Sequence, residues 1–472
     1  MLALPSVRVR ERRWQALPLA VAVLPLVAVL VAILVFRPYY GIEDDATLLG
    51  MVGDAGKHGF PTVWWHHLSA DVDTWGMVRP FYWALAYVEY RAGYSSPTTL
   101  YVLNWLATGF ALAVCGVALA RAFRVPRGRR LVFYGVYGAA AIAFPWTLDL
   151  FAFSSLQEKW VILAAGLGLL WFAEPRARTS PAVWYSASAA LIVLGALTKA
   201  QYLVFLPAFL LLVMDARRRE GVPKARVWFV LGAGAVVAIA VRVLAAHGTY
   251  TSQFRLSNVP TQLRSHYFWL IVAFAVVWGA YVLVRRRRGE DTLLVDLIPL
   301  VVFSAFAVVF VEWTGFVFGI VAPVAAAAPA LAASRLPNAR LQAVALAAAI
   351  VWALAWVSVR SNELYGPLAS LGDFARSRPA VAAAHGQPVY ISCQEGSSAI
   401  AYYVRRETGA SLSVRPEAGV PWAAAKGTPP PDSFRYTLAD AHLCPALIDP
   451  AAWAPIWRSS QEGGFTLYRR RG

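Results

Sequence analysis

Three consecutive carboxylates, Glu43, Asp44 and Asp45, follow a long apolar run near the start of the chain. Charges at the edge of an apolar segment are costly unless they are solvated, paired or functional. A carboxylate beside a hydroxyl nucleophile can accept its proton during attack, which is general base catalysis. The structural alternative is that Asp45 caps a helix beginning at ATLLGMV, near the positive end of the helix dipole.

Further ionisable residues stand at the boundaries of other apolar segments or in the polar stretches between them. Groups in such positions are functional candidates. Arginine and lysine in particular stabilise the negative charge that develops on a departing phosphate. These residues are Arg79, Glu158, Lys159 and Lys199, with Arg255 in a later polar stretch.

Each of these ionisable residues also has a structural explanation. Lys199 can extend along apolar surface until its ammonium group reaches water. Arg79 can form an ion pair with Asp71 or Asp73. The acid and base at 158–159 can form a solvated rim. Residue type alone therefore leaves both interpretations open.

Two adjacent histidines, His66 and His67, precede Asp71 and Asp73, and these residue types bind transition metals. Adjacent histidines face one ion only where the backbone is irregular. We therefore predict no metal ligands. The sequence establishes no cofactor and leaves a requirement for a divalent metal open.

The composition is that of a membrane protein. Of the 472 residues, 59% are hydrophobic and only 15% are charged, whereas soluble proteins carry about 25% charged residues. The net charge is +17. The basic residues gather in short loops between apolar runs, so we predict a topology signal and no nucleic-acid partner.

Apolar runs long enough to cross a bilayer recur along the chain, and we count about eleven of them. The basic loops fall on one side if the spans alternate, which puts the N-terminus in the cytoplasm and the C-terminus outside. The first run is predicted to be an uncleaved signal anchor. Asp44 and the other ionisable candidates then share the outer side, which favours function. The runs are 17–36, 99–120, 131–147, 156–173, 182–198, 200–214, 227–246, 266–284, 293–311, 315–333 and 341–358.

Two domains are predicted: an all-α polytopic transmembrane domain over 1–359 and a small extracytoplasmic α/β domain over 360–472. The first outer loop, 37–98, fits two interfacial helices, ATLLGMVGDAGKHG and RPFYWALAYVEYRAG, each ended by Gly. In the C-terminal domain, PVYISC, ASLSV and FTLYRRR are predicted strands, and SSAIAYYVRRETG is a predicted helix.

The three cysteines fit this topology. Cys115 lies inside the second span and is expected to be inert packing. Cys393 and Cys444 lie in the exported segment, where an oxidising compartment favours a disulfide between them.

The layout resembles the GT-C membrane glycosyltransferases, which take a sugar from a polyprenyl-phosphate carrier on the outer face of the membrane. Within that class it is most similar to bacterial transferases that modify lipopolysaccharide or other surface glycans. It departs from the oligosaccharyltransferase pattern, because its second loop offers only Asp149 and Glu158 as carboxylates. The resemblance rests on Asp44-Asp45 after the first span, Arg79-Pro80 in a long first outer loop, LTK at 197–199 followed by FLPAFLLL, and the exported C-terminal domain.

This resemblance implies transfer of a sugar, with inversion, from a polyprenyl-phosphate carrier to a cell-envelope glycan, lipid or protein. It implies that Asp44 or Asp45 is the general base, in an acidic cluster with Glu43. We favour Asp44 as the base and assign Asp45 to capping or orientation. The residues expected at the donor phosphate are Arg79, Lys199, Lys159 and Arg255, with Glu158 as a second carboxylate.

Two other functions remain as alternatives. Lipid-linked glycan flippases and transporters usually carry broken helices, mid-bilayer charges and repeated halves, and we find no repeated halves in this sequence. O-antigen polymerases and ligases tend to place a large functional loop late in the chain, whereas here the acidic first loop dominates.

Overall fold

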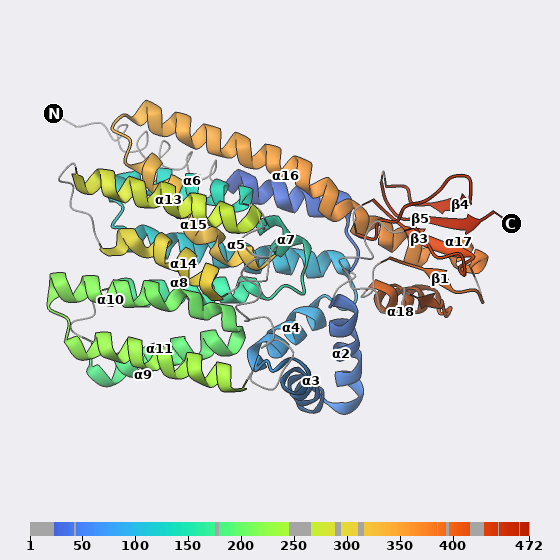
Figure 1. Cartoon of the computed structure of the whole chain (residues 1–472), viewed down its shortest axis with the longest axis horizontal. Helices are drawn as coiled ribbons and strands as arrows, with labels where there is room; N and C mark the ends of the chain where they lie inside the picture. The colour runs from blue at the N-terminus through green and yellow to red at the C-terminus, as the bar shows by residue number, and fades with distance from the viewer. Residues whose placement is uncertain are drawn as a thin grey trace, which may run out of the picture.

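The computed structural model describes residues 23–41, 44–144, 146–174, 179–244, 266–287, 294–309, 316–384, 386–392, 396–415, 429–441, 443–461 and 463–471. Long helices run side by side through most of the molecule, and a small sheet lies at one end beside the C-terminus (Figure 1). Three residues singled out by the sequence, Glu43, Arg255 and Cys393, lie outside the described residues.

The helices follow the predicted apolar runs. Within the described ranges, five segments are long and apolar enough to cross a membrane: Pro97–Ala122, Pro181–Thr198, Ala200–Glu220, Lys224–Val241 and Ala339–Arg376. The helices of this part are Val23–Phe36, α5 (Pro97–Ala122), α6 (Arg130–Ala143), α8 (Glu158–Ala173), α9 (Pro181–Thr198), η2 (Ala200–Phe205), α10 (Leu206–Glu220), α11 (Lys224–Leu244), α13 (His266–Arg287), η6 (Leu294–Leu297), α14 (Ile298–Val309), η7 (Phe316–Val321), α15 (Ala322–Ser334) and α16 (Ala339–Arg376).

Local sequence explains where several of these helices begin. Ser96 and Ser180 accept hydrogen bonds from backbone N–H groups in the first turns of α5 and α9, and both helices start with proline. Small residues then let helices approach. A Cβ added to Gly166 of α8 would lie 2.9 Å from the sulfur of Cys115 in α5. Cys115 is a free, buried cysteine, as predicted.

Two ends of the helix bundle can be told apart by their ion pairs. Arg121 pairs with Glu174, and Arg124 lies 2.8 Å from Asp215, so the basic end of α5 meets the C-terminal ends of α8 and α10. The helix α8 begins at Glu158, its opposite end. The basic loops and the acidic start of α8 therefore lie at opposite ends of the bundle.

The segment 37–98, predicted to be the first outer loop, contains three helices, α2 (Asp45–His58), α3 (Phe60–Trp75) and α4 (Pro80–Ala92). The two predicted helices are confirmed as α2 and α4. The third, α3, was missed because Gly59 and Pro61 are typical of a loop. Gly59 instead takes φ 82° between two helices, and Pro61 lies in the first turn of α3, where its missing N–H costs nothing. A short η1 (Arg127–Arg129) and α7 (Thr147–Ala152) complete the connections.

The long helix α16 continues through residue 360, where the sequence predicts a domain boundary, and is followed by α17 (Arg378–Ala383). The C-terminal sheet has the order β2-β1-β3-β5-β4, with β1 parallel to β2 and β3, and β5 antiparallel to β3 and β4. The predicted β1, β5 and α18 are confirmed, the predicted strand ASLSV overlaps β2 only at Val414, and β3 and β4 were missed. The elements are β1 (Val389–Tyr390), α18 (Gly396–Thr408), β2 (Val414–Arg415), β3 (Tyr436–Ala439), β4 (Trp453–Arg458) and β5 (Thr466–Arg470).

The C-terminal domain and the first outer loop share one hydrophobic core. Leu48 of α2 and Tyr90 of α4 belong to the same buried cluster as Ile400 of α18 and Leu438 of β3. The helix α18 packs against both α2 and α16 (Figure 1). Cys444 is disulfide-bonded, and its predicted partner is outside the described residues. Asp45, at the start of α2, thus lies between elements from both ends of the chain.

Candidate active site

Asp44 immediately precedes α2, and its side chain makes no capping hydrogen bond to that helix. It is exposed to solvent, yet desolvation by the surrounding protein is the largest cause that raises its pKa above the ordinary 3.8. The positive charges of Arg79 and Lys199 oppose this rise, so both cations lie within electrostatic range of the carboxylate. The Tyr82 hydroxyl lies 3.5 Å from its Oδ2. An accessible carboxylate with a raised pKa has the properties of a general base.

Asp45 is buried and serves a different purpose. Its Oδ2 accepts the backbone N–H of Gly41 at 2.6 Å, and its Oδ1 accepts the Tyr90 hydroxyl. The carbonyl of Gly41 in turn accepts the Tyr403 hydroxyl from α18. The capping alternative for Asp45 is therefore wrong, because Gly41 and Tyr90 occupy its two oxygens. Asp45 instead ties the segment before Asp44 to α4.

Arg79 is held rigidly beside Asp44. Its Nε and Nη2 donate to the two oxygens of Asp71, each at 2.9 Å. The indole of Trp83 donates to Asp71 at 2.8 Å, and the Arg79 guanidinium lies 4.4 Å from the centre of the Tyr82 ring. The pairing of Arg79 with Asp71 is the structural alternative noted from the sequence, and it is confirmed. A two-bond pair of this kind fixes the plane of the guanidinium.

Lys199 lies in extended backbone between α9 and η2 and forms an ion pair with Glu158 at the start of α8. Both residues are buried. The start of α8 and the end of α9 lie close to α4 of the first outer loop. The ammonium group of Lys199 is therefore within electrostatic reach of Asp44.

Lys159 points to a separate, fully buried cluster. Its ammonium group lies 3.0 Å from Glu89 of α4, and it donates to Asn104 at 2.8 Å and to the carbonyl of Ser154 at 2.9 Å. Three partners match the three donors of an ammonium group. The interpretation of residues 158–159 as a solvated rim is wrong, because neither side chain has exposed surface.

Several buried acceptors in this region have no hydrogen-bond donor within the described residues. They include one oxygen each of Glu89, Gln157 and Glu158. Buried polar atoms are normally satisfied by protein or water. These acceptors are therefore suited to hydroxyl groups of a polar ligand.

Asp149, the other second-loop carboxylate, lies in α7 and is directed at α16. Its Oδ1 is 3.7 Å from Arg360. Burial raises the pKa of Asp149 to about 6, and the nearby Arg360 opposes the rise. This carboxylate has a separate cationic partner from Asp44.

The sequence analysis predicted that His66, His67, Asp71 and Asp73 do not bind a metal ion. In the part of the chain that the structure describes, no group of three or more potential metal-binding side chains is found. The His67 ring stacks on Trp83 at 4.6 Å, and the oxygens of Asp71 accept hydrogen bonds from Arg79 and Trp83.

The sequence analysis did not single out three residues at this site: Tyr82, Glu89 and Asn104. Glu89 had an available signal, because an acid within an apolar aromatic helix needs a partner. Tyr82 and Asn104 had none, since tyrosine is ordinary in an interfacial helix and asparagine is tolerated in a span.

No protein-family model matches the chain, and no curated protein matches it. Two crystal structures of ArnT from Cupriavidus metallidurans are similar to it. The structure bound to undecaprenyl phosphate is 15% identical, covers 96% of this chain and 97% of its own, and gives a TM-score of 0.51. The apo structure is 16% identical, covers 97% of this chain and 98% of its own, and gives a TM-score of 0.51. This likeness over nearly whole chains confirms the predicted GT-C-like fold.

Proposed function

We propose that this protein transfers a sugar from a polyprenyl-phosphate carrier to a cell-envelope acceptor, with inversion, at the outer face of the bacterial inner membrane. The observation that carries the proposal is the exposed Asp44 carboxylate, which lies 3.5 Å from the Tyr82 hydroxyl, while the Arg79 guanidinium lies 4.4 Å from the centre of the same tyrosine ring. One structure of similar fold is bound to undecaprenyl phosphate, which supports a carrier of that chemical class here.

The proposed chemistry is a single displacement. The acceptor oxygen attacks the anomeric carbon while Asp44 accepts the hydroxyl proton. The bond between that carbon and the phosphate oxygen breaks, and its electrons go to the phosphate, which becomes a monoester dianion. Arg79 and Lys199 stabilise this growing charge, and Arg can do so through two parallel hydrogen bonds.

The other predicted site residues take supporting roles in the proposal. Glu158 positions Lys199 through their ion pair. Lys159, whose donors are all occupied within the protein, is reassigned from phosphate binding to holding Glu89. Arg255 and Glu43 stay predictions from sequence.

The proposed topology has about eleven spans, a cytoplasmic N-terminus and the C-terminal domain outside. Two ion pairs support it. Arg121 and Arg124 pair with acids at the C-terminal ends of α8 and α10, whereas α8 begins at Glu158, at the opposite end of the bundle. Basic residues gather on the cytoplasmic side of membrane proteins, so the Asp44 end faces outward in this proposal.

The proposal is tested with full-length protein reconstituted in liposomes together with an undecaprenyl-phosphate-linked sugar and a cell-envelope glycan extract. Mass spectrometry is expected to detect release of undecaprenyl phosphate and a matching mass gain in the acceptor. Movement of intact lipid-linked sugar across the bilayer, without cleavage, would instead assign the protein to the flippases.

The Arg79→Lys variant is expected to lose activity although it keeps the positive charge. A lysine cannot reproduce the two-bond geometry, so we expect kcat to fall on the order of 10²-fold. The matched control is Arg91→Lys, an exposed arginine at the other end of α4, which should retain full activity. Equal activity of the two variants in the release assay would remove Arg79 from the phosphate site.

The pH dependence follows from the raised pKa of Asp44. A general base must be deprotonated, so kcat/KM should fall as the pH drops through the pKa of the free enzyme. Because desolvation raises that pKa above 3.8, the acid limb should lie at higher pH than for an ordinary aspartate. The measurement is the release assay across acidic buffers. A fall in kcat/KM centred on the ordinary aspartate pKa of 3.8 would contradict the assignment of Asp44 as the base.

A further inference from the structure

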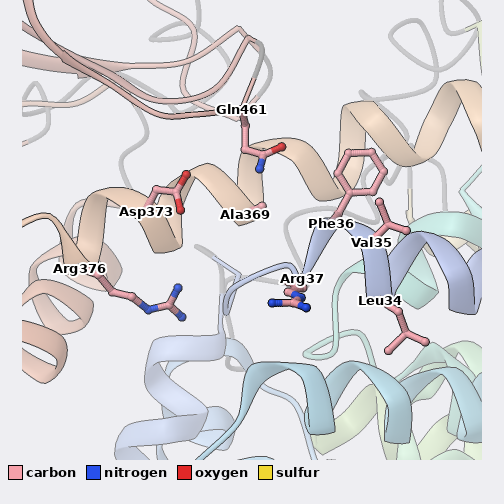
Figure 2. A pocket seen from close by; sticks show the side chains of 8 residues that line it. All are labelled: Leu34, Val35, Phe36, Arg37, Ala369, Asp373, Arg376 and Gln461. Atoms are coloured by element: carbon pink, nitrogen blue, oxygen red, sulfur yellow. The ribbon is translucent and has the colours of Figure 1, made fainter.

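A cavity of about 450 Å³ lies between the end of the helix Val23–Phe36, the long helix α16 and the connection between β4 and β5 (Figure 2). Its volume falls in the range of roughly 300–1,000 Å³ that is usual for small-molecule sites. It does not include Asp44 or its cationic partners. Its lining residues are Leu34, Val35, Phe36, Arg37, Ala369, Asp373, Arg376 and Gln461.

The lining changes from apolar to charged along the cavity. Leu34 and Val35 belong to an apolar helix and are 49% and 70% exposed. In a membrane protein such exposed aliphatic surface faces lipid chains. Arg37 follows directly, where the chain leaves the apolar segment. An occupant that matches this lining has an apolar chain and a polar head.

The charged end favours an anion. Figure 2 shows the Arg376 side chain extending from α16 toward Arg37. Arg376 lies 3.6 Å from Glu407 and over the Tyr39 ring at 5.0 Å, whereas no ion pair of Arg37 is found among the residues that the structure describes. Two guanidinium groups at one cavity repel each other, and a phosphate between them relieves that repulsion through charge-assisted hydrogen bonds.

The acid in the lining is already engaged. One oxygen of Asp373 accepts the hydroxyls of Ser459 and Ser460, each at 2.9 Å. These bonds join α16 to the end of β4 and turn the carboxylate charge toward the C-terminal domain. Among the lining residues two arginines therefore stand against one acid, and Glu407, which pairs with Arg376, is not part of the lining.

The backbone at Arg37 is itself unusual. Its φ of 48° lies in the left-handed region that residues with a side chain seldom adopt. The next residues are fixed by a hydrogen bond from the Tyr39 N–H to the carbonyl of Leu368 in α16. A strained residue that is held by its surroundings often marks a ligand site.

We infer that this cavity binds an anionic membrane phospholipid. Its phosphate lies between Arg37 and Arg376, and an acyl chain runs along Leu34 and Val35. The bound lipid joins the first membrane helix, α16 and the C-terminal domain at the surface of the bilayer. This site is separate from the proposed sugar transfer and does not depend on it.

The test is native mass spectrometry of full-length protein in detergent, titrated with phosphatidylglycerol or phosphatidylcholine. We expect phosphatidylglycerol to bind more tightly. Each arginine should contribute about fivefold, so Arg37→Asn with Arg376→Gln should weaken binding about 25-fold. Asparagine tolerates the left-handed backbone at residue 37, which removes the charge without adding strain. The control, Arg378→Gln, changes an exposed arginine on α17 that does not line the cavity.

A second variant, Ala369→Trp, fills the cavity and leaves every charge in place, and it should also weaken phosphatidylglycerol binding. Thermal unfolding of each variant shows that the protein is folded. Equal binding of the two lipids would overturn the inference, as would unchanged binding in a folded double-arginine variant. Displacement of the lipid by inorganic phosphate at equal concentration would assign the arginines to a free anion and also overturn it.

Discussion

Asp44→Asn is expected to reduce kcat by about 10²–10⁴-fold, which is the usual contribution of a general base. The substitution keeps the shape of the side chain but removes its ability to accept a proton. The side chain is exposed and makes no capping bond to α2. Removal of the Asp44 charge should therefore leave the temperature of unfolding nearly unchanged.

The measurement is the rate of undecaprenyl phosphate release, with thermal unfolding followed on the same preparations. Asp54→Asn is the matched control, because Asp54 is an exposed carboxylate in α2, the helix that follows Asp44, and its near partner is Lys57. It should retain both activity and stability. An Asp44→Asn protein that releases carrier phosphate at the normal rate would exclude Asp44 as the base.

Lys159→Met is expected to lower the free energy of unfolding by about 3–5 kcal/mol, the usual cost of removing one partner from a buried ion pair. The side chain has no exposed surface and holds Glu89 at 3.0 Å. Without the ammonium group, Glu89 is left buried without its cationic partner, and Asn104 loses a donor.

The stability loss is measured by denaturant titration of the purified protein in detergent. Adding Glu89→Gln to Lys159→Met should restore part of the loss, because the uncompensated charge is then removed. Lys57→Met provides the control, since that side chain is 72% exposed and exposed pairs contribute about 0–1 kcal/mol. A stable but inactive Lys159→Met protein would contradict our reassignment and return Lys159 to the donor phosphate.

Much of the outer-loop architecture was readable from local sequence. The ends of α2 and α4 were predicted because Gly59 and Gly93 follow them, and Pro80 opens the second. These signals act over a few residues, so no distant contact is needed to interpret them. The helix α3 was missed because Gly59 and Pro61 are typical of a loop, whereas the strands β3 and β4 were missed because their pairings depend on strands elsewhere in the chain.

The difference between Asp44 and Asp45 could not be predicted from sequence. Two adjacent acids have the same chemistry, and their roles diverge because Tyr90 and Gly41 occupy the second while the first stays accessible. Tyr403, which holds the carbonyl of Gly41, lies 362 positions further along the chain. Burial and partners of this kind exist only after the chain has folded.

By itself, the sequence determined that the chain is a largely apolar, helical membrane protein with acids and cations at the ends of its apolar runs. Apolar length and charge placement act locally, and so they can be read along the chain. Tertiary structure alone decided that Asp44 lies within electrostatic range of Arg79 and Lys199 while Lys159 is buried against Glu89. Desolvation and charge pairing depend on distances in space, which separation along the sequence does not specify.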